Sequence, residues 1–165
     1  VAALPDSFST LIRRLPELSC LRFTGNAEFA RELEAHDALG TWAAKAWHAL
    51  VAANSYAAAK LAGEFAGSME MYLQDTPPGM PGYSRQRHAR DESEPVKKNE
   101  KHRLARVFPV PSAVDRGGVA YMGAHFKIAQ FGMISPRIHY LDATAIDGLV
   151  YVGYIGAHLP TARTN

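Results

Sequence analysis

Four basic or titratable side chains recur at alternate positions in the C-terminal third of the sequence. His125 and Lys127 lie in the run GVAYMGAHFKI, and Arg137 and His139 lie in the run MISPRIHYL. Alternate residues of a β-strand point to the same face of a sheet, so each pair shares a face if its run forms a strand. Two imidazoles beside two cations are suited to proton transfer on a bound phosphate ester.

The predicted pairing of these strands brings the side chains together on one sheet face. A short loop over residues 130–132 would set His125 opposite Arg137. Tyr151, in the next run LVYVGYI, would then lie beside His139. Because antiparallel sheets often leave one face to solvent, we expect this face to be open. The expected catalytic residues are His125, His139, Lys127, Arg137 and Tyr151.

This set predicts cleavage of RNA phosphodiesters without a metal or another cofactor. One neutral imidazole would take the proton of the 2′-hydroxyl, a protonated one would donate to the leaving 5′-oxygen, and the cations would stabilise the phosphorane. We therefore expect a hydrolase of the nuclease class, a metal-independent ribonuclease or a toxin-like effector. In general layout the chain resembles small microbial and toxin ribonucleases. The carboxylate base of some of those enzymes has no counterpart in the predicted strands.

The stretch between residues 85 and 106 is densely charged, with eight Lys and Arg residues against four Asp and Glu residues. Arg85, Arg87, Lys97 and Lys98 could contact phosphates, together with Lys127 and Arg137 of the sheet. The simpler interpretation of such a stretch is a solvated loop or surface helix. Its His88, Asp91, Glu92 and Glu94 lack a recognised ligand spacing, so we expect no metal site there.

The elements that position these residues fall into a helical half and a strand half. A first helix is expected to begin after Asp6 or Ser7 and to end before Pro16, and further helices are expected from about Asn26 to His36 and from Thr41 to about Phe65. Four strands follow, within 106–111, 118–128, 133–141 and 149–155, separated by glycine-containing turns. The predicted fold is one α+β domain in which N-terminal helices pack on one face of a C-terminal antiparallel β-meander. Its parts are the helices of about 1–75, a connection over about 76–105 and the sheet of about 106–157.

Composition limits the remaining function classes. The 165 residues are 47% hydrophobic and 21% charged with a net charge of +2, which is typical of one globular domain. The lone Cys20 excludes an internal disulfide, and no apolar run is long enough to span a membrane, so we expect a cytoplasmic protein. The alternative function is a non-catalytic module that binds nucleic acid or another anion. Its helical half would dock on a protein partner, and the chain, which begins with Val1, would be a segment of a larger protein.

Overall fold

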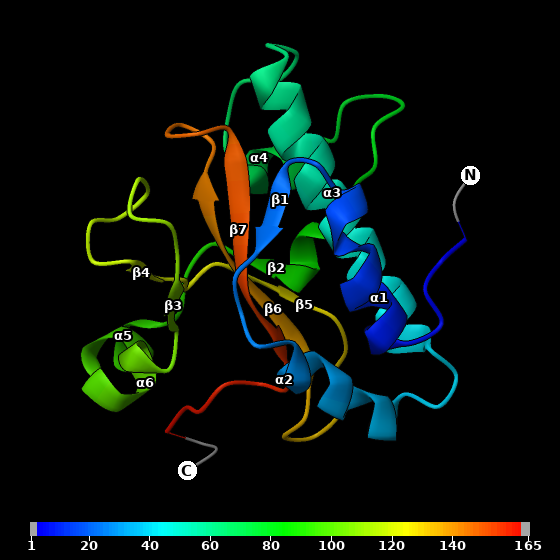
Figure 1. Ribbon diagram of the computed structural model, residues 1–165, viewed down its shortest axis with the longest axis vertical. Helices are drawn as coiled ribbons and strands as arrows, with labels where there is room; N and C mark the ends of the chain where they lie inside the picture. Colours follow the sequence, from blue (N-terminus) through cyan, green and yellow to red (C-terminus); the bar gives the residue numbers. More distant parts are fainter. Residues whose placement is uncertain (1–2, 163–165) are drawn as a thin grey trace.

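The computed structural model describes residues 3–162 and shows a five-stranded sheet, a two-stranded sheet and six α-helices. In Figure 1, α1 and α3 lie on the right of the larger sheet, while α5, α6 and the small sheet lie on its left. The helices are α1 (Phe8–Arg14), α2 (Ala27–Glu32), α3 (Thr41–Leu61), α4 (Met69–Gln74), α5 (Glu94–Lys98) and α6 (Glu100–Leu104), with 3-10 turns at Leu15–Glu17, Leu33–His36 and Arg85–Arg87. The strands are β1 (Leu21–Phe23), β2 (His88–Ala89), β3 (Val107–Pro109), β4 (Val119–Tyr121), β5 (His125–Lys127), β6 (Arg137–Ala143) and β7 (Leu149–Gly156).

The helices α1 and α2 begin at side-chain caps. The Ser7 hydroxyl accepts a hydrogen bond from the Thr10 amide at the start of α1, and the Asn26 side chain caps α2 in the same way. The long helix α3 buries a face rich in alanine. It ends at Leu61, before the predicted end near Phe65, because Gly63 just beyond it adopts a left-handed conformation.

The larger sheet is mixed, which corrects the prediction of a purely antiparallel meander. Its strand order is β1-β7-β6-β5-β2, and β1 pairs with β7 in parallel. The three C-terminal strands β5, β6 and β7 are antiparallel neighbours, as predicted. The two strands that the sequence analysis missed, β1 and β2, have three and two residues. Strands so short carry no alternating pattern to detect.

Two hydrophobic clusters cover the two faces of this sheet. The main core joins the alanine-rich face of α3 to the sheet residues Phe126, Ile138 and Val152. The second cluster, on the face that carries His125 and His139, contains Val110, Met122, Ala143 and Tyr151. This face was predicted to be open to solvent. It is instead covered, since His125 is 7% and His139 is 1% exposed.

The predicted strand at 118–128 is two strands in two sheets. Residues before Gly123 form β4, which pairs with β3, and residues after it form β5, which pairs with β6. A Cβ atom at Gly123 would lie 2.2 Å from an Asp91 carboxylate oxygen, so any other residue would displace the Asp91 side chain where the chain crosses between the sheets. The next predicted strand also begins later, at Arg137, after Ser135 with φ +24° and Pro136.

The charged stretch is more regular than the sequence suggests. Between residues 85 and 104 it forms a 3-10 turn, the short strand β2 and the helices α5 and α6. Asn99 caps α6 by accepting a hydrogen bond from the His102 amide. Within residues 3–162, no helix has the length and apolar character that crossing a membrane requires.

Candidate functional site

The two histidines predicted from the strands face each other directly. His125 of β5 pairs with His139 of β6, and their rings stack with centroids 4.7 Å apart and an interplanar angle of 26°. The sequence predicted His125 opposite Arg137, a register two residues away. The cause is the longer connection, in which Ile128 bonds to Pro136 and Lys127 pairs with Arg137. The correct register places the imidazoles closer than predicted.

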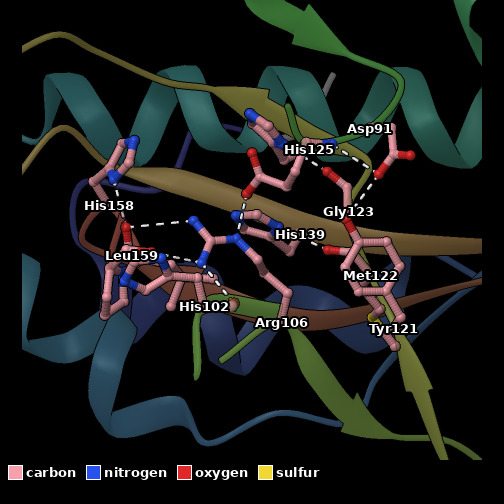
Figure 2. Close-up of polar contacts among 12 residues, drawn as sticks. Asp91, His102, Arg106, Tyr121, Met122, Gly123, His125, His139, His158 and Leu159 are labelled. Atoms are coloured by element: carbon pink, nitrogen blue, oxygen red, sulfur yellow. Dashed lines mark hydrogen bonds and ion pairs between the residues drawn. The ribbon is translucent and has the colours of Figure 1, made fainter. Parts of the chain in front are cut away.

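Both imidazoles are held through Nδ1 by the backbone that crosses between the sheets. Nδ1–H of His125 donates to the Gly123 carbonyl at 2.8 Å, and Nδ1–H of His139 donates to the Met122 carbonyl at 2.9 Å (Figure 2). These bonds fix the tautomer, so each Nε2 carries a lone pair. Among residues 3–162, neither Nε2 atom has a hydrogen-bond partner. The break at Gly123 thus supplies carbonyls that orient two free imidazole nitrogens.

Burial keeps both rings neutral. It lowers the pKa of His125 below the ordinary 6.5, although the hydrogen bond to Gly123 and the nearby Glu92 carboxylate act in the opposite direction. Burial and then the neighbouring His125 hold the pKa of His139 well below 6.5. The two imidazoles are therefore proton acceptors at neutral pH, and of the two His125 gains the proton more readily.

A carboxylate and a guanidinium complete the cluster, and sequence analysis missed both roles. Glu92 lies between β2 and α5, and one of its oxygens lies within 4.8 Å of a ring nitrogen of each histidine. The Nε–H of Arg106 donates to Glu92. Arg106 is 1% exposed and also donates to the carbonyls of His102 and Pro160 at 2.9 and 2.7 Å. In Figure 2, His139 and Arg106 lie below His125, and the charge of Arg106 helps to lower the pKa of His139.

Local hydrogen bonds explain why Glu92 faces the histidines. The neighbouring Asp91 accepts from the Tyr121 hydroxyl of β4 at 2.8 Å and from Lys97 of α5 at 3.0 Å. It also accepts from the Glu92 amide at 2.7 Å. Asp91 therefore ties the segment before α5 to the small sheet, and this places Glu92 over the imidazole pair.

Three predicted phosphate-binding residues lie together beside the histidines. Arg137 and Lys127 are paired on β6 and β5, and both lower the pKa of His125 through their charge. With Arg87 they line a cavity of about 330 Å³, completed by Gln86, Ala129 and Gln130. No acidic residue lines this cavity in the part of the chain that the structure describes. Arg137 is half-buried, and its Nε has no hydrogen-bond partner there.

The other predicted site residues are placed elsewhere. Arg85 lies 3.8 Å from Glu70, Lys97 pairs with Asp91 and Glu94, and Lys98 is exposed. Tyr151 shares the sheet face with His139, as predicted, but the bulge between His139 and Tyr140 places Tyr154 opposite His139 instead. The Tyr151 hydroxyl donates to Asp147 at 2.5 Å. It is directed toward the turn between β6 and β7, not toward the imidazoles.

The chain was compared with protein families, curated proteins and solved structures. No family model, no curated protein and no solved structure matches the chain. The cluster of Glu92, Arg106, His125 and His139 and the cationic cavity beside it are therefore the features that bear on function.

Proposed function

We propose that the chain cleaves RNA phosphodiesters without a metal ion, with His125 and His139 as the proton-transfer groups. The observation that carries this proposal is that the stacked pair of His125 and His139 lies in the same two strands as Lys127 and Arg137. These two cations and Arg87 line a cavity in which no acid takes part among the described residues. An RNA phosphate has the charge that Arg87, Lys127 and Arg137 would bind. RNA also carries its own nucleophile, the 2′-hydroxyl, so the protein has only to bind the phosphate and move protons.

The pKa order of the imidazoles assigns their roles. His139, whose pKa is lowered most, is the neutral base that accepts the 2′-hydroxyl proton through Nε2. His125 is the acid that protonates the leaving 5′-oxygen, because the Glu92 carboxylate favours its charged form. The 2′-oxygen forms a bond to phosphorus as the bond to the 5′-oxygen breaks, which leaves a cyclic phosphate. Lys127 and Arg137 stabilise the charge that develops on the phosphorane oxygens.

Burial of the imidazoles also predicts the pH dependence of this reaction. The active form needs one neutral and one protonated imidazole, and it is most populated between the two pKa values. Both values lie below 6.5, because burial lowers both. The rate of RNA cleavage is therefore expected to be bell-shaped in pH with a maximum on the acidic side of 6.5.

The test is cleavage of a short fluorescent RNA in the presence of a chelator. His125→Ala should lower the rate roughly 100-fold or more, since it removes one proton-transfer role. His48→Ala is the matched control, because His48 is exposed on α3 away from the cluster, and its rate should be unchanged. A DNA strand of the same sequence should resist cleavage, because it lacks the 2′-hydroxyl.

Two results would overturn the proposal. Equal rates for wild-type protein and His125→Ala, with the fold intact by circular dichroism, would show that the imidazole transfers no proton. Salt-sensitive RNA binding without any cleavage would favour the non-catalytic module instead, with the logarithm of affinity falling linearly with that of salt concentration.

A further inference from the structure

Three donor atoms converge in the cluster described above. One oxygen of Glu92 and one ring nitrogen each of His125 and His139 all lie within 4.8 Å of one another. The ligands of a tetrahedral zinc ion, with bonds near 2.0–2.2 Å, lie about 3.4 Å apart. The spacing of the three atoms is therefore close to that of a metal site.

The backbone fixes both imidazoles in the way that metal-binding histidines require. Each Nδ1–H donates to a main-chain carbonyl, at Gly123 and at Met122, which leaves Nε2 as the ligand atom. His139 is 1% exposed, so the three donor atoms meet in an enclosed part of the protein. Arg106 donates a hydrogen bond to the Glu92 carboxylate and so holds it in position to act as a ligand.

The donor set selects the kind of ion. Two neutral imidazoles with one carboxylate suit Zn²⁺ and other divalent transition metals, whereas Ca²⁺ and Mg²⁺ prefer oxygen ligands throughout. Three protein ligands leave at least one position for water or an anion. The positive charge of Arg106 opposes a second cation at Glu92, so affinity is expected to be lower than in a closed structural zinc site.

We propose that Glu92, His125 and His139 bind one divalent transition-metal ion such as Zn²⁺, and that bound metal inhibits the protein. The inhibitory part rests on the function proposed above. A metal bound to Nε2 of both histidines blocks the nitrogen that accepts the proton in His139 and prevents His125 from carrying a proton on Nε2. The ion and the proton-transfer reaction therefore exclude each other, and free Zn²⁺ would act as a reversible off-switch.

The binding test uses Co²⁺ alone as a spectroscopic probe of the metal-free chain. One equivalent should give visible absorption bands of a low-symmetry site, and Zn²⁺ should displace them. His125→Gln and Glu92→Gln each remove a ligand, so each should weaken binding by more than the roughly 10- to 100-fold typical of an outer-shell change. His48→Ala is the control and should bind like the wild-type protein. If a ligand variant fails to fold, the Co²⁺ spectrum of the wild-type protein still shows whether the chain binds one metal ion.

The two proposals fail in different ways. Absence of saturable Co²⁺ binding, or binding that survives both ligand substitutions, overturns the metal site whatever the activity. RNA cleavage that is inhibited by Zn²⁺ at the concentration that displaces Co²⁺ supports both proposals. Cleavage that appears only with added metal overturns the inhibitory role and the metal-free reaction together. Metal binding without cleavage under any condition leaves the site standing and overturns only the proposed function.

Discussion

Arg106 carries a buried positive charge that needs an anionic partner. The substitution Glu92→Gln removes that partner and so tests how much the ion pair contributes to the free energy of unfolding. Arg106 is 1% exposed, and the Glu92 side chain is 13% exposed. The other hydrogen bonds of Arg106 end on neutral carbonyls, those of His102 and Pro160 among them. Glu92 is the one anionic partner of Arg106 among the described residues. Its substitution therefore leaves a guanidinium in a low-dielectric environment with only dipoles around it.

The expected cost follows from this burial. Breaking a buried ion pair by removing one partner costs about 3–5 kcal/mol, because the remaining charge stays desolvated. The glutamine oxygen can still accept the Nε–H bond, and Glu92 is not wholly buried. We therefore expect a loss near the lower end, about 3 kcal/mol. Urea unfolding measures it as a lower midpoint with an unchanged m-value.

The chain offers a matched control two residues away. Glu94 has a 67% exposed side chain and pairs with Lys97 at 3.0 Å, so Glu94→Gln should cost less than about 1 kcal/mol. The double substitution of Glu92→Gln with Arg106→Met should be less destabilised than Glu92→Gln alone, because it removes the orphaned charge. If Glu92→Gln costs no more than Glu94→Gln, the buried ion pair is not the feature that we describe.

Two further predictions concern stability. Phe126 is 1% exposed in the main core, so Phe126→Ala should cost about 3–5 kcal/mol in urea unfolding, and a loss below about 1 kcal/mol would contradict its position. Burial lowers the pKa of His88, His125 and His139, so these imidazoles take up protons more readily in the unfolded chain. The free energy of unfolding should therefore decrease as pH falls below 6.5 toward their folded-state values. Urea midpoints that stay constant from pH 7.5 to 5 would argue against neutral, buried imidazoles.

Alternation along the strands was enough to predict which side chains share a face. His125, Lys127, Arg137 and His139 carry a period-2 pattern through two strands, and the structure puts them on one face. The exact register was wrong because it depends on the loop. Residues 128–136 contain a left-handed Ser135 and the constrained Pro136, so the connection is longer than a tight hairpin. Such a loop has no simple sequence signature.

The sequence did not predict that the sheet face with His125 and His139 is covered. It is produced by β3, β4 and the C-terminal segment, together with α5 and α6, which have five residues each. Helices of this length have too few turns to show an apolar stripe. Their Lys and Glu residues were instead interpreted as a solvated stretch. Because α5 and α6 were not predicted, the sheet face with the histidines was expected to be open to solvent.

Glu92 and Arg106 lie in the charged stretch of residues 85–106, and the sequence alone does not distinguish them from its exposed residues. In the sequence they are one acid and one base among many between residues 85 and 106, and nothing in their spacing separates them from Glu94 or Lys97. Only tertiary contacts distinguish them, because Arg106 is enclosed while Glu94 faces solvent. Apolar residues of similar volume would often give a fold as stable as a buried ion pair does. The stability of the fold therefore does not account for the pair, and Arg106 is placed to orient the Glu92 carboxylate beside the two neutral imidazoles.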